Sequence, residues 1–92
     1  MLENLSNNFK KVFEYLKSKG IHEIWVSEDV DFSSEYPVGS IYIISNSKDV
    51  DCFVYDTLTN YDSEDVGCSI AVAELNNRLG VDLRRGKRKV IF

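Results

Sequence analysis

Two carboxylates stand one residue apart in Asp49-Val50-Asp51, directly before the apolar run Cys52-Phe53-Val54. The dipeptide Gly39-Ser40 precedes them in the chain. On a strand, a pair of carboxylates with this spacing can hold Mg²⁺ against the phosphates of a nucleotide. The pattern therefore raises the hypothesis of a nucleotidyl transfer site.

Together with the later segment Leu79-Gly80-Val81-Asp82-Leu83, these motifs resemble the minimal nucleotidyltransferase family. The resemblance implies that Asp49, Asp51 and Asp82 act as catalytic carboxylates that bind Mg²⁺. In that family the Gly-Ser pair directly ends the first strand after the helix. Here Gly39-Ser40 comes later and runs into an apolar segment that is typical of a strand. We keep this enzyme as the alternative hypothesis.

Other catalytic and metal-binding patterns are incomplete in the sequence. His22 is the single histidine, and no nucleophile is implied beside it. The segment 29–40 does not fit a calcium loop, because Ser34 and Ser40 stand where Gly and a bidentate Glu belong. Cys52 and Cys68 are too few for a disulfide scaffold, and we expect both to be reduced and buried. The leading hypothesis needs no catalytic residue, metal or cofactor.

Length and composition bound the fold. The chain has 92 residues, of which 43% are hydrophobic and 28% charged, which is ordinary for one globular domain covering residues 1–92. No apolar run approaches the length of about 18 residues needed to span a membrane. We therefore expect a soluble, cytoplasmic domain.

Apolar spacing predicts a first helix whose stripe includes Leu2, Leu5, Phe9, Val12, Phe13 and Leu16, ended by Gly20. Three strands are expected next, over residues 21–27, 38–45 and 50–55, with a hairpin connection at 46–49. A second, largely buried helix is predicted from a cap at Asp62 or Ser63 to Gly80.

Two alternatives remain open for residues 81–92. They form either a hairpin that turns at Gly86-Lys87 or a basic loop followed by a strand over residues 89–92. The expected order is α-β-β-β-α-β(β). It predicts a two-layer α+β domain with a mainly antiparallel sheet and two helices packed on one face.

Charge is segregated along the chain. Residues 21–65 carry eleven acids against Lys48 alone. The leading hypothesis is a non-enzymatic acidic interaction protein that engages a basic surface of a protein partner. The residues expected to contact that partner, with Phe32 and Tyr36 as exposed anchors, are Glu28, Asp29, Asp31, Phe32, Glu35, Tyr36, Asp49 and Asp51. Inhibitors and accessory proteins of phages and other mobile elements have similar size and acidity, so we expect by analogy a role of that kind.

A basic patch near the end of the chain comprises Arg84, Arg85, Lys87, Arg88 and Lys89. Nucleic-acid binding through this segment is a third hypothesis, set against neutralisation of the acidic middle of the chain. The segment Val90-Ile91-Phe92 is expected to form an edge strand that can pair with a second copy to give a homodimer.

Overall fold

The protein is described by a computed structural model for residues 4–45, 47–58, 68–73 and 84–92, and for residues 51 and 68–73 the description covers the backbone. Within these ranges the elements follow the order α-β-β-α-β-β. Their bounds are α1 (Asn7–Ser18), β1 (Glu23–Val26), β2 (Gly39–Ile44), α2 (Lys48–Leu58), β3 (Cys68–Ala73) and β4 (Arg88–Ile91).

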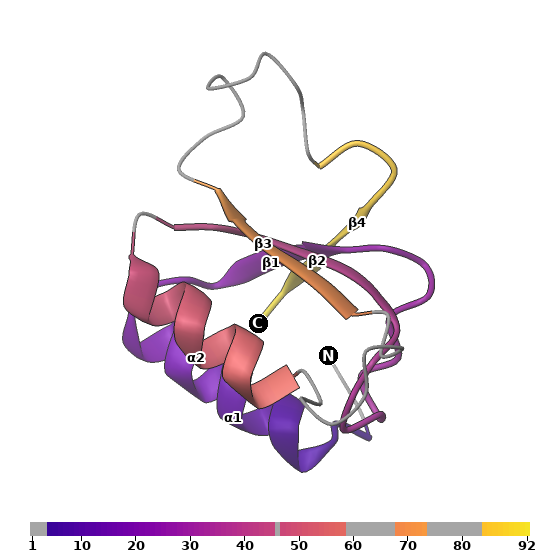
Figure 1. The fold of residues 1–92 in the computed structure, drawn as a ribbon, viewed down its shortest axis with the longest axis horizontal. Helices are drawn as coiled ribbons and strands as arrows, with labels where there is room; N and C mark the ends of the chain where they lie inside the picture. Colours follow the sequence, from indigo (N-terminus) through magenta and orange to yellow (C-terminus); the bar gives the residue numbers. More distant parts are fainter. Residues whose placement is uncertain (1–3, 46, 59–67, 74–83) are drawn as a thin grey trace.

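The strands form one sheet in the order β3-β2-β1-β4. Strand β1 runs antiparallel to β2 and β4, whereas β3 runs parallel to β2. Parallel neighbours need a crossover connection, and α2 stands between β2 and β3 in the chain. Both helices lie on one face of the sheet (Figure 1). The predicted α+β class, with two helices on one face of a mainly antiparallel sheet, is confirmed.

The core lies between this sheet and the two helices. Side chains alternate between the faces of a strand, and the residues of β1, β2 and β4 that face the helices are Ile24, Val26, Ile41, Ile43 and Val90. A helix repeats its buried side at spacings of three and four residues. The buried apolar residues of these elements are Phe9, Val12, Phe13, Leu16, Ile24, Val26, Ile41, Ile43, Val50, Val54, Leu58 and Val90.

Helix α1 buries Phe9, Val12, Phe13 and Leu16 of the predicted stripe and ends as predicted, whereas Leu5 precedes the helix and Leu2 lies outside the described residues. Its N-cap is Ser6, whose hydroxyl accepts from the Phe9 N–H at 3.1 Å. At the other end the Gly20 N–H donates to Lys17 O, and the Ile21 N–H donates to Leu16 O. This is the Schellman arrangement, and it requires the left-handed φ of +78° that Gly20 adopts.

The predicted strand over residues 50–55 is wrong, because this segment belongs to α2. Val50, Val54 and Leu58 repeat at a spacing of four and are all buried, which is the helical period. The Ser47 hydroxyl accepts from the Val50 N–H at 3.4 Å, as at a helix N-terminus. Residues 46–49 therefore do not connect a hairpin. A short contiguous apolar run does not distinguish strand from helix by itself.

The predicted second helix is also wrong over residues 68–73, which form β3. Six residues of β3 pair in parallel register with six of β2, from Gly39 with Cys68 to Ile44 with Ala73. The segment Cys-Ser-Ile-Ala-Val-Ala contains the β-branched Ile70 and Val72 at alternate positions, which favours a strand. The rest of the predicted helix, 62–67 and 74–80, lies outside the described residues.

A turn over residues 84–87 leads into β4. The Lys87 N–H donates to Arg84 O at 3.0 Å, and Gly86 has a φ of +76°. Gly86 is thus the second central residue of the turn, so the predicted turn centred on Gly86-Lys87 is wrong. A type II′ turn has glycine at its first central position, which is the position predicted for Gly86. In the structure Gly86 occupies the second central position, and the positive φ falls there. Strand β4 pairs with β1, and residues 81–83 lie outside the described part of the chain.

Candidate partner-binding surfaces

The carboxylates of the nucleotidyltransferase hypothesis do not stand on a strand. Asp49 lies exposed in the first turn of α2, and Asp51 follows in the same helix. Helix positions two apart are separated by about 200° around the axis, so the strand spacing of the family motif is lost. Asp82 lies outside the described residues. Among the residues that are described, no group of three or more His, Cys, Asp or Glu is arranged to hold a metal.

Gly39-Ser40 forms the neck of a loop. Residues 27–38, here called the acidic loop, leave the end of β1 and return at the start of β2. The Ser40 N–H donates to the Ser27 hydroxyl at 2.9 Å, and the Ser27 N–H donates to Ser40 O at the same distance. Gly39 has a φ of +123°, and a Cβ there would lie 2.6 Å from Ser27 Oγ. The glycine is therefore explained by close backbone packing at this neck.

Phe32 fastens the acidic loop to the core. Its side chain is 9% exposed and meets the Phe9 ring edge-on at a centroid distance of 4.9 Å. The Ser6 N–H donates to Phe32 O at 2.8 Å. The prediction of Phe32 as an exposed anchor is therefore wrong. An aromatic side chain within an acidic segment was read as free to bind, but the stripe of α1 provides its partners.

Two of the predicted acids have hydrogen-bonding roles within the chain. The Glu35 carboxylate accepts from the N–H groups of Asn7 and Asn8, and Glu35 O accepts from the Asn8 side-chain amide. Asp31 accepts from the Ser33 N–H and hydroxyl at 2.9 and 2.7 Å. These hydrogen bonds, that of the hydroxyl first, lower the pKa of Asp31. Both carboxylates therefore order the loop.

Glu28, Asp29, Tyr36 and Val38 face outward from the acidic loop. Glu28 and Asp29 are exposed and make no hydrogen bond or ion pair with any other described residue. Tyr36 is 45% exposed and Val38 is 56% exposed. These four residues are here called the loop surface. They combine two carboxylates with two apolar side chains on an ordered backbone.

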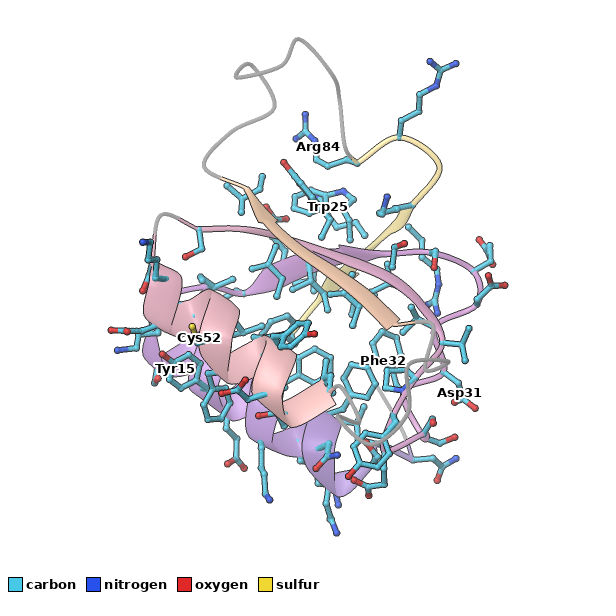
Figure 2. The ribbon with its side chains drawn as sticks, viewed as in Figure 1. Tyr15, Trp25, Asp31, Phe32, Cys52 and Arg84 are labelled. Atoms are coloured by element: carbon cyan, nitrogen blue, oxygen red, sulfur yellow. The ribbon has the colours of Figure 1, made fainter. Side chains whose placement is uncertain are left out.

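The other predicted acids lie away from the loop surface. Helix α2 begins at the end of the helical layer opposite the acidic loop (Figure 1). Asp31 is labelled at the loop end in Figure 2. Asp49 and Asp51, at the start of α2, therefore do not join Glu28 and Asp29 in one continuous surface.

Sequence reasoning missed Trp25. It is half-buried on the face of the sheet turned away from the helices, beside Arg84 (Figure 2). Ile24 and Val26 on either side of it are buried in the core, and this alternation was the signal that could have found it. Tyr42 and Lys89 are its register partners on β2 and β4.

Two cations lie over the Trp25 ring. The Arg84 guanidinium carbon is 5.5 Å and Lys89 Nζ 5.9 Å from the ring centroid, both within cation–π range. The Tyr42 ring meets Trp25 edge-on at 6.2 Å. Lys89 also forms an ion pair with Glu23 at 3.3 Å. We call Trp25, Tyr42, Arg84 and Lys89 the Trp25 face.

Arg88 of the predicted basic patch turns to the other side of the sheet. Its guanidinium carbon lies 5.4 Å from the Phe32 ring centroid, and Nη2 donates to Val30 O at 3.4 Å. Arg84, Arg85 and Lys89 are exposed, and Lys87 is half-buried. The basic patch is therefore divided between the acidic loop and the Trp25 face.

His22 and Cys52, considered in the sequence analysis, are both exposed. His22 is exposed at the start of β1. Cys52 is exposed on α2, so the prediction that it is buried is wrong. Its apolar neighbours Phe53 and Val54 lie toward the helical interface instead, as helical geometry requires.

No protein-family model, curated protein or solved structure matches this chain. In the described ranges, neither helix has the length and apolar character of a membrane span.

Proposed function

We propose that the protein is a non-enzymatic interaction protein that binds a basic surface of a protein partner through the loop surface. The observation that carries the proposal is that one loop presents two outward-facing apolar side chains, Tyr36 and Val38, together with the exposed carboxylates of Glu28 and Asp29, which pair with no other residue that the structure describes. Aromatic side chains that become desolvated dominate binding energies. Nearby charges of the opposite sign steer the approach and select the partner.

The order of the acidic loop supports this role. Phe32 is packed in the core, Glu35 is bonded to α1, and Ser27 joins the loop ends. A loop held in its binding conformation loses less entropy on association than a flexible one. Tyr36 and Glu28 are thus presented on a fixed backbone. The predicted anchor pair is revised to Tyr36 and Val38.

The biological role of the protein and its location in the cell are further parts of this proposal. A small acidic protein with a pre-ordered loop suits an inhibitor or accessory role, in which a partner's basic surface is covered. Such a role is proposed in the cytoplasm. It requires no cofactor, and Asp49 and Asp51 take no part in it.

The test is capture of partners from a lysate of the source organism on the immobilised protein, followed by affinity measurement with the purified partner. We expect Tyr36→Ala to weaken binding by about 10-fold or more. The double variant Glu28→Lys/Asp29→Lys should slow association and remove its salt dependence. The matched control Glu14→Lys reverses an exposed charge on α1 and should bind as wild type. Equal affinity of all four proteins would contradict the proposal.

We also propose that β4 pairs with β4 of a second copy. Strand β4 is at the end of the sheet order, and Ile91 is 69% exposed. The Phe92 N–H donates to His22 O at 2.9 Å. Bonded pairs alternate along an antiparallel ladder, so Lys89 and Ile91 direct their backbone N–H and C=O groups away from β1.

Only certain registers satisfy these outward groups. An antiparallel pair centred on Val90 places Lys89 opposite Ile91 of the second copy. A shifted register that places Lys89 opposite Lys89 of the second copy would bring two positive charges together and is disfavoured. The favoured register continues the sheet across the two-fold axis and covers Ile91.

Self-association is measured by sedimentation over a concentration series. We expect Ile91→Lys to shift the equilibrium to monomer. Ile91→Pro should do the same, since it removes an N–H that points away from β1 and leaves the β1 ladder intact. Val38→Lys changes another exposed apolar residue, away from β4, and should leave the equilibrium unchanged. A wild-type chain that stays monomeric at millimolar concentration would overturn this pairing.

A further inference from the structure

The Trp25 face combines a flat aromatic surface with positive charge. The Trp25 ring lies between β2 and β4 and is flanked by the Arg84 guanidinium and the Lys89 ammonium group. Tyr42 is almost fully buried beside it and fixes one edge of the ring. The indole therefore has a set orientation on the sheet rather than a free side chain.

The turn before β4 adds charge beside this ring. Arg85 is exposed and makes no hydrogen bond or ion pair with another described residue. Lys87 lies in the same turn, which is closed by the hydrogen bond that the Lys87 N–H donates to Arg84 O. Glu23 offsets one of these charges through Lys89, and both of those side chains are about half exposed. The described residues of this turn and of β4 thus bring several basic side chains together, although the chain carries a net charge of −4.

These features fit a ligand with both phosphates and flat aromatic groups. An acidic peptide would be satisfied by the cations alone and would not use the indole. In a duplex the bases are already stacked on one another and are not available to the ring. Single-stranded nucleic acid offers both groups, since its bases stack on aromatic side chains and its phosphates follow basic residues.

We propose that the Trp25 face binds single-stranded nucleic acid, with one base stacked on Trp25 and the flanking phosphates bound by Arg84, Arg85 and Lys89. An incoming base takes the place of a cation on the ring, and the displaced cation pairs with a phosphate. The loop surface is not part of this site. The proposal therefore does not depend on the proposed protein partner.

Trp25 is the chain's single tryptophan, so its fluorescence reports on this site alone. The protein is titrated with oligothymidylate and oligouridylate of about 10 nucleotides, which is within the usual site size. We expect the fluorescence to be quenched and the affinity to fall steeply with salt. The two arms show whether DNA or RNA is preferred. An abasic oligonucleotide of equal length should bind more weakly and should not quench.

Variants distinguish binding at the Trp25 face from a general effect of charge on nucleic-acid affinity. Arg85→Glu should weaken binding roughly 10-fold, since it reverses a phosphate contact. Lys11→Glu makes the same change on the exposed side of α1 and should have no effect beyond 2-fold. Trp25→Phe, followed by anisotropy of a labelled oligonucleotide, should reduce affinity while retaining the fold by circular dichroism. Glu28→Lys/Asp29→Lys should not reduce nucleic-acid binding.

Three results would overturn the proposal. They are the absence of binding at low salt, equal quenching by the abasic strand, and equal affinity of Arg85→Glu and wild type. Tight binding of an acidic peptide with no binding of oligonucleotides would assign the face to an acidic protein instead. None of these results would bear on the loop surface, because its variants are measured against a different ligand.

Discussion

The carboxylate of Glu35 accepts a hydrogen bond from the backbone N–H of Asn7, 28 positions earlier in the chain, at 3.1 Å. The second carboxylate oxygen accepts from the N–H of Asn8 at 3.2 Å. The first N–H groups of a helix have no partner within it, and its positive end favours a negative charge. One side chain of the acidic loop thus completes α1 and ties the loop to it.

Replacement of Glu35 by Ala should lower the free energy of unfolding by about 1 kcal/mol, the usual value of a lost helix cap. Glu35→Gln keeps an acceptor but loses the charge, so it should cost less. Urea unfolding at neutral pH measures both. Glu28→Ala removes an exposed carboxylate without described contacts and should change stability by less than about 0.5 kcal/mol. Equal stability of the Glu35 and Glu28 variants would show that the cap contributes nothing.

Phe32→Ala should destabilise the fold by about 3 kcal/mol, toward the lower end for a buried phenylalanine. The ring packs against Phe9 and Phe13, and Arg88 lies over it. Phe32→Leu keeps most of the volume and should cost about half as much. Denaturant unfolding followed by circular dichroism distinguishes the two. A loss below about 1 kcal/mol for Phe32→Ala would mean that the loop is not fastened by this residue.

Local signals in the sequence were sufficient for α1. The apolar stripe and Gly20 act within a few residues of one another, so their meaning does not depend on the rest of the fold. The segments 50–55 and 68–73 were assigned to the wrong elements because each is a short apolar run. Their identities depend on tertiary partners: α1 and the sheet for Val50 and Val54, and β2 for the strand from Cys68 to Ala73.

The candidate surfaces show the same division. Exposure of Glu28, Asp29 and Tyr36 was predicted from composition and is found. The role of Glu35 was not predictable, since its carboxylate contacts residues of α1 that are distant in sequence. The Trp25 face joins β1, β2, β4 and the turn before β4, so it arises only when the sheet is assembled.

Asp31 gives a pH dependence that can be measured directly. Its hydrogen bonds from Ser33 lower its pKa below the ordinary value of 3.8. Because the folded-state pKa lies below that of the unfolded chain, the contribution to stability is present above about pH 4 and is lost as the pH falls through the folded-state pKa. Carboxyl carbon NMR should show the pKa of Asp31 rising in Ser33→Ala. Ser34→Ala should leave it unchanged, and a rise in both variants would contradict the assignment.

Gly39 and Gly86 provide a matched pair for the neck of the acidic loop. Both have a positive φ, which costs about 1–2 kcal/mol for alanine. At Gly86 a Cβ meets nothing within 4 Å, whereas at Gly39 it would lie 2.6 Å from Ser27 Oγ and 2.8 Å from Val30 Cγ2. Gly39→Ala should therefore lower stability by clearly more than Gly86→Ala, by about 1–3 kcal/mol beyond it, because the neck must open. Thermal and urea unfolding measure the difference, and hydrogen exchange at Ser40 N–H should increase only in Gly39→Ala. Equal losses in the two variants would mean that the neck is not tightly packed and that the loop surface is not held by it.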